Sequence, residues 1–157
     1  MVFEFGKYIL DIDVEKTGAF YRHAARITDG CTCQGCRNYE KWASSLSGAS
    51  RAIFEGMGIL PEKSPEVYVN CPNSDGSLFY GGFYHLSGTI MQGSEPWKEI
   101  SVNISALDED PFFPLAPGFR AAFTENVALL EKDFPAPVIQ MEILANIPFV
   151  LPEKCTY

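Results

Sequence analysis

Polar and apolar residues alternate along several stretches of the chain, and this period of two is typical of a strand with one buried face. The even positions of residues 7–15 are apolar, namely Tyr8, Leu10, Ile12 and Val14. Residues 100–106 and 138–147 repeat the pattern, and residues 119–127 show it more weakly. The polar positions of the stretch 138–147, which we expect to face water, are Gln140, Glu142 and Asn146. One-sided strands are typical of antiparallel sheets, so the sequence predicts a mostly antiparallel sheet.

Residues 66–90 contain the clearest hairpin signal. Two runs rich in β-branched and aromatic residues flank the sequence NSDG at 73–76, which favours a turn. The second run contains Gly81 and Gly82, and adjacent glycines inside a strand indicate a bulge, a sharp bend or a close approach of the backbone to another segment.

Helical periodicity is confined to residues 36–58. An apolar stripe at i, i+3, i+4 and i+7 consists of Tyr39, Trp42, Ala43 and Leu46. Gly48 interrupts this stripe, and a second short stripe follows it with Ala49, Ala52, Ile53 and Met57. Residues 16–28 are compatible with a helix or a strand, and we favour a strand. The expected fold class is therefore α+β, a mostly antiparallel β-sheet with a short helical pair inserted after the cysteines at 31–36.

Length and charge narrow the class of protein. A chain of 157 residues predicts a single domain, residues 1–157. The net charge of −8 argues against nucleic acid and anionic membrane surfaces as partners, because both require clustered Lys and Arg. No apolar run reaches the roughly 18–20 residues of a membrane span, and the first ten residues do not resemble a secretory signal. We therefore expect a cytoplasmic protein, in which thiols are normally kept reduced.

The cysteine spacing is the feature that most suggests chemistry. Three of the five cysteines form the pattern Cys31-x-Cys33-x2-Cys36, and Cys71 follows in the predicted hairpin. Four sulfur ligands suit a tetrahedral zinc ion, and a C-x2-C turn lets both of its sulfurs reach one metal. We therefore predict a structural zinc site formed by Cys31, Cys33, Cys36 and Cys71.

The choice of the fourth ligand rests on the hairpin geometry. If the turn is centred between Ser74 and Asp75, Cys71 lies opposite Leu78, and His85 is then seven residues further along the strand, about 23 Å away. His85 is therefore a poor ligand for this site, and His23 is the reserve candidate. Cys155, near the C-terminus, is expected to take no part.

Two other readings of the cysteines remain open. Free cysteine is among the most buried residue types and often only fills space in a metal-free core. Alternatively, Cys33 or Cys36 is a reactive thiol of a redox sensor or enzyme, because the unpaired N–H groups at the start of a helix favour a thiolate.

The segment YGGFYH at 80–85 brings four rings next to two glycines. The functional interpretation is a groove for a ligand, lined by Tyr80, Phe83, Tyr84 and His85. The alternative, which we favour, is a bent core strand with rings packed on both faces. A hydrolytic triad has little support, because the chain has only two histidines and no G-x-S-x-G motif.

Three segments carry a resemblance to other proteins. The cluster CTCQGCRNY, the hairpin EVYVNCPNSDGSLFYGGFYHLSG and the ending QMEILANIPFVL resemble those of a group of small uncharacterised proteins of Gram-positive bacteria. The resemblance implies a free-standing cytoplasmic domain and brings no activity, substrate or catalytic residue. The leading hypothesis is a non-enzymatic α+β module with a structural zinc ion that binds a protein or small-molecule partner.

Overall fold

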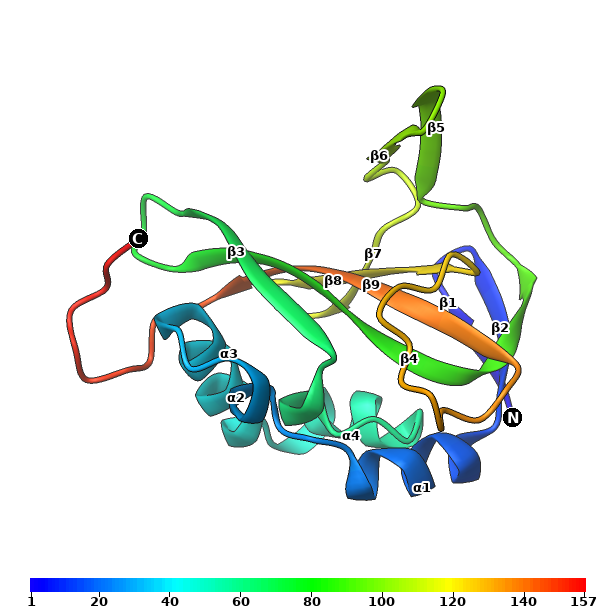
Figure 1. The fold of residues 1–157 in the computed structure, drawn as a ribbon, viewed down its shortest axis with the longest axis horizontal. Helices are drawn as coiled ribbons and strands as arrows, with labels where there is room; N and C mark the ends of the chain where they lie inside the picture. The colour runs from blue at the N-terminus through cyan, green and yellow to red at the C-terminus, as the bar shows by residue number, and fades with distance from the viewer.

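A computed structural model describes residues 1–157 of the chain (Figure 1). Its main element is a seven-stranded sheet in which all neighbours are antiparallel, in the order β1-β2-β4-β9-β8-β7, with β3 also paired to β4. The strands of this sheet are β1 (Val2–Phe5), β2 (Tyr8–Ile12), β3 (Glu66–Pro72), β4 (Leu78–Gln92), β7 (Phe113–Ala116), β8 (Phe119–Thr124) and β9 (Val138–Ile147).

The helices lie together on one face of this sheet, which we call the inner face (Figure 1). They are α1 (Val14–His23), α2 (Ile27–Gly30), α3 (Gln34–Ser45), α4 (Gly48–Gly56) and the short 3-10 helix η1 (Pro61–Lys63). None of them has the length and apolar character needed to cross a bilayer. The prediction of an α+β fold with helices after the cysteine cluster is confirmed.

Strand β4 is the central strand of the sheet and pairs with three other strands. One of its edges pairs with β9 over ten residues, and its other edge pairs with β3 in the first half and with β2 in the second half. Pairing passes through Gly81 and Gly82 without a register shift, so of the alternatives expected there the structure shows the close approach. A side chain at Gly82 would collide with the carbonyl oxygen of Glu66, and one at Gly81 would meet the Tyr68 ring at 2.6 Å.

Helix α1 fills the gap that β2 and β3 leave on the edge of β4. The Tyr21 hydroxyl donates to the carbonyl of His85 and accepts from its N–H, at 3.0 Å in both cases. The Ser87 N–H donates to Thr17 Oγ1 at 3.0 Å, and the Ser87 carbonyl accepts from the Asp13 N–H at 2.8 Å. Side chains and a helix start therefore satisfy the backbone groups that a neighbouring strand would satisfy elsewhere.

The strand that we favoured for residues 16–28 is wrong. Strand β2 ends at Ile12 because Asp13 is the N-cap of α1 and its side chain accepts from the Lys16 N–H at 3.0 Å. Thr17 and Tyr21 are then four residues apart on one helix face, and both are buried against β4. The polar Asp13 and this four-residue spacing are the local signals for the helix.

Tyrosine hydroxyls join the inner face of the sheet to the helices. The Tyr80 hydroxyl donates to the Gly35 carbonyl, and the Tyr84 hydroxyl donates to the Pro61 carbonyl, both at 2.7 Å. The Tyr39 hydroxyl lies 2.7 Å from that of Tyr84 and therefore donates to it. All three tyrosines are fully buried, so their hydroxyls replace water with protein partners in the core.

The single strand predicted over residues 100–106 is also wrong. These residues belong to a separate hairpin of β5 (Trp97–Ser101) and β6 (Ile104–Leu107), which projects from the sheet (Figure 1). Asn103 has φ 62, a left-handed conformation that asparagine tolerates and that a tight turn requires. The apolar side chains of this segment are exposed rather than buried, namely Ile100, Val102 and Ile104.

Strand β9 covers the predicted stretch and buries its expected apolar face. Its polar face was expected to be wet, yet Gln140 and Glu142 are only 2% and 3% exposed. These two side chains lie on the outer face of the sheet, opposite the helices, where they bond to Ala128 and Trp97 of covering segments. Asn146 is exposed as expected, whereas segments distant in the chain bury Gln140 and Glu142.

Candidate metal centre

Three cysteines meet where α2 ends and α3 begins. Cys31 is the C-cap of α2, Cys33 is the N-cap of α3, and Cys36 lies in the first turn of α3. The Sγ atoms of the three residues lie within 4.8 Å of one another. Because zinc–sulfur bonds are about 2.3 Å long, two sulfurs of a tetrahedral zinc site lie about 3.8 Å apart. The observed cluster is close to this spacing and can bind a metal ion.

The three thiols differ in environment. Cys36 is buried, and burial together with the Cys31 and Cys33 sulfurs raises the pKa of its thiol. Partial burial also acts to raise the pKa of the exposed Cys33. The Cys36 N–H, 3.5 Å from Cys33 Sγ, and the neighbouring thiols outweigh this and lower that pKa. Cys33 therefore ionises more readily than Cys36, as expected for a thiol at a helix N-terminus.

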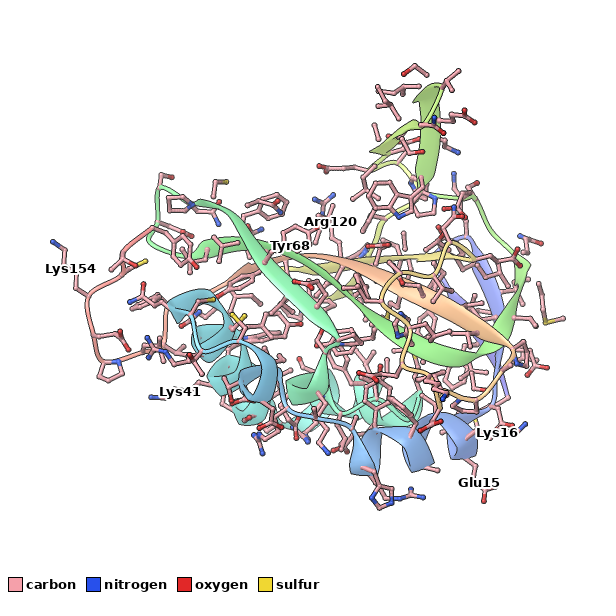
Figure 2. All side chains as sticks on the ribbon, in the orientation of Figure 1. Glu15, Lys16, Lys41, Tyr68, Arg120 and Lys154 are labelled. Atoms are coloured by element: carbon pink, nitrogen blue, oxygen red, sulfur yellow. The ribbon has the colours of Figure 1, made fainter.

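The C-terminal segment supports the start of α3. The Gln34 side chain donates to the Lys154 carbonyl and accepts from the Thr156 N–H, both at 2.8 Å. Arg37 forms an ion pair with Glu153. Figure 2 labels Lys154 on this segment. The last residues of the chain therefore hold the turn that carries Cys33 and Cys36.

Two residues of α3 that contact the C-terminal segment or its neighbours could not be recognised from sequence spacing. Asn38 is fully buried, and its side chain accepts from the Val150 N–H at 2.7 Å and donates to the Pro148 carbonyl at 3.2 Å. At Gly35, a side chain would meet the Tyr157 hydroxyl at 2.7 Å and Val69 at 2.9 Å. A polar residue on the apolar side of a predicted helix was the only signal available for Asn38.

Cys71, predicted as the fourth ligand, is not among the three gathered cysteines and is exposed. A bulge between Val69 and Cys71 shifts the register, so that Cys71 pairs with Phe79 and not with Leu78 as expected. Side chains alternate along a strand, and a shift of one residue moves a side chain to the opposite face. Because Tyr80 points toward the helices, Phe79 and Cys71 lie on the outer face, away from α3.

A cleft of about 680 Å³ adjoins the cysteine cluster. Cys31 and Cys36 line this cleft, and so does His23, the reserve ligand, from the end of α1. His23 is exposed and does not belong to the group of ligand atoms within 4.8 Å. Cys155 is partly buried in the C-terminal segment, outside the cluster. The arrangement is thus a three-sulfur site with an accessible side.

The four aromatic residues of the YGGFYH segment do not line one groove. Tyr80 and Tyr84 are buried on the inner face, where they bond to the helices. Phe83 and His85 point to the outer face, and the His85 Nε2 lies 3.1 Å from Gln140 Oε1. This is the core strand with rings on both faces that we favoured. Phe83 alone lines a pocket on the outer face.

Comparison of the chain with protein-family models, with curated protein sequences and with solved structures gave no significant match. The fold and the site define an α+β protein with a three-cysteine cluster that can bind a metal ion.

Proposed function

We propose that this protein is a zinc-binding module in which Cys31, Cys33 and Cys36 hold the ion and a protein or small-molecule partner binds to the surrounding surface. The observation that carries the proposal is the approach of the three Sγ atoms to within 4.8 Å. Thiolates are soft ligands that suit zinc, and three protein ligands leave one position for water or a group from the adjoining cleft.

The proposed role of the ion is mainly structural. It would tie the end of α2 to the start of α3, and structural zinc can supply on the order of 10 kcal/mol of apparent binding energy. Binding would also release protons, since the buried Cys36 must lose its proton to become a ligand. The two exposed sulfurs, on Cys31 and Cys33, would leave the ion accessible from the side of the cleft.

Metal content by mass spectrometry on untagged protein tests the proposal directly. We expect about one zinc ion per chain in the wild type. Cys31→Ser, Cys33→Ser and Cys36→Ser should each lower the zinc content, whereas the matched controls Cys71→Ser and Cys155→Ser should retain it. Wild-type protein without metal would contradict the proposal. Loss of zinc in Cys71→Ser would contradict the three-sulfur site and support the four-cysteine site predicted from the sequence.

A second candidate function is dithiol–disulfide exchange. It is favoured because Cys33 is exposed while Cys36, three residues later, is buried. The exposed Cys33 at the helix start could attack a disulfide and form a mixed disulfide, releasing one thiol. The buried Cys36 could then attack Cys33 Sγ, which releases the second thiol and leaves a Cys33–Cys36 disulfide. The substrate gains the two electrons that the protein loses. Cys31 Sγ also lies within 4.8 Å of Cys33 Sγ, so the test removes both neighbouring thiols. In the metal-free double variant Cys31→Ser/Cys36→Ser, glutathione disulfide should form a mixed disulfide with Cys33 that persists, and mass measurement of the peptide that contains Cys33 detects it.

A further inference from the structure

The outer face of the sheet holds a pocket of about 460 Å³ that is separate from the cysteines. Strands β3, β4 and β9 form its floor, and β5, β6 and residues 125–128 form its walls. Figure 2 labels Tyr68 on β3, on the side of the sheet away from the helices. The lining contains two carboxylates, Glu125 and Glu142, and no Lys, Arg or His side chain.

Three aromatic side chains surround the deeper carboxylate. Phe83 is the direct cross-strand partner of Glu142, and the Trp97 indole N–H donates to Glu142 Oε1 at 2.9 Å. The Tyr68 ring lies over Gly81, where a side chain would meet it at 2.6 Å. The absence of a side chain at Gly81 is therefore what allows the Tyr68 ring to lie against the backbone of β4 at the edge of the pocket.

Hydrogen bonds from neighbouring side chains determine which carboxylate oxygen of Glu142 is free to face the pocket. Gln140 Oε1 accepts from the Ala128 N–H at 2.8 Å, so its amide nitrogen faces Glu142 and donates to Oε1 at 2.7 Å. Trp97 donates to the same oxygen. Both hydrogen bonds thus end on Oε1, which leaves Oε2 without a protein donor in a residue that is only 3% exposed and lines the pocket.

Glu142 also has no cationic partner in the protein, since none of the ion pairs includes it. Arg120, two residues from Ala122 on the neighbouring strand, forms its ion pair with Glu109 instead. Removing a carboxylate from water without a counter-charge is costly, so a buried one in a pocket suits a ligand that brings a positive charge.

We propose that this pocket binds a small organic ammonium ion, with Glu142 Oε2 facing the charge and the rings of Tyr68, Phe83 and Trp97 surrounding its carbon atoms. Aromatic faces attract cations through their quadrupole, and aromatic rings combined with a carboxylate recognise alkylated ammonium groups in particular. Glu125 at the exposed rim adds attraction without closing the entrance. The pocket does not use the cysteines, so the proposal is independent of the metal.

Choline and its neutral isostere 3,3-dimethylbutan-1-ol test this proposal, with the Trp97 indole N–H resonance as the readout. We expect choline to shift that resonance to saturation with a dissociation constant of about 1 mM or tighter. The alcohol should bind at least about tenfold more weakly, because it lacks the charge. Potassium chloride at the same ionic strength should leave the resonance unchanged.

Two variants separate recognition from folding. Glu142→Gln keeps an acceptor for Trp97 and should weaken choline binding by about tenfold or more while the rest of the spectrum stays dispersed. Tyr68→Leu should weaken it less, because two rings remain. Equal binding of choline and the alcohol, unchanged binding to Glu142→Gln, or no saturable shift with choline would each overturn the proposal.

Discussion

The hydroxyl of Tyr21 takes the place of a strand beside His85, since it bonds to both the N–H and the carbonyl of that residue at 3.0 Å. This relationship explains how β4 can be shared by two short strands on one edge. It also explains why α1 must start directly after β2, because the helix has to bring Tyr21 and Thr17 to the unpaired part of β4.

Removing this hydroxyl should destabilise the protein. Tyr21→Phe leaves the N–H and carbonyl of His85 buried without their partner, which costs about 1–3 kcal/mol. Urea unfolding followed by circular dichroism measures the change in the free energy of unfolding. Tyr68→Phe is the matched control, because Tyr68 is exposed, and it should change the free energy of unfolding by less than about 0.5 kcal/mol. Equal losses in the two variants would contradict the role given to Tyr21.

Chelation should change the reactivity of the cysteine cluster. In protein as purified, Ellman's reagent should label the exposed Cys71 quickly and the three clustered thiols slowly, because bound zinc occupies their sulfurs. Adding a chelator should then release the clustered thiols for rapid labelling. Labelling of Cys71→Ser isolates the slow phase. Rapid labelling of Cys33 that does not respond to chelator would favour the dithiol function over zinc binding.

The stability of the protein should respond to pH through Glu142. Burial raises the pKa of its carboxyl above the ordinary 4.5. The hydrogen bonds from Trp97 and Gln140 act in the other direction without cancelling this, and the charge of Glu95 adds a smaller rise. A raised pKa in the folded state means that the protonated carboxyl stabilises the fold below pH 4.5, and that this contribution is lost as the pH rises through the folded-state pKa.

Glu142→Gln has no such dependence, so its free energy of unfolding relative to the wild type should increase from pH 4 to pH 7 as measured by urea unfolding. Glu99→Gln, at an exposed position of β5, is the control and should show no comparable trend. A difference between Glu142→Gln and wild type that is flat over this range would contradict the assignment.

The two adjacent glycines of β4 should tolerate substitution unequally. Gly82→Ala places a methyl group against the Glu66 carbonyl of the paired strand, which cannot move without breaking the ladder, and it should cost about 1–3 kcal/mol. Gly81→Ala meets only the end of the Tyr68 side chain, which can rotate away. It should therefore cost less stability but weaken choline binding. A larger loss of stability for Gly81→Ala, seen in urea unfolding, would contradict this reading.

Local patterns predicted much of this fold. The alternation in 138–147 marked β9 and its inner face, and the stripe through Tyr39 and Ala43 marked the buried side of α3. The short spacing of Cys31, Cys33 and Cys36 was sufficient to predict their cluster, because a helix start brings residues three positions apart together.

Two of the errors depend on interactions that a local pattern does not contain. The bulge before Cys71 moves that residue to the outer face, and the sequence alternation of β3 does not predict the bulge. Gln140 and Glu142, on the polar side of β9, are buried because Trp97 and Ala128, distant in sequence, cover them. The ambiguity of residues 16–28 was resolved by Asp13, a helix cap three residues before that segment that also fits the strand alternation of residues 7–15.

The sharing of β4 between β2, β3 and α1 has a consequence for self-association. An uncovered stretch of strand edge is a template on which another polypeptide can add, and such edges promote aggregation. Here the donors and acceptors of residues 83–87 are already occupied by Ser64, Tyr21, Thr17 and Asp13. Between its pairing with β3 and its pairing with β2, the edge of β4 therefore offers no free backbone groups on which another chain could add as a strand.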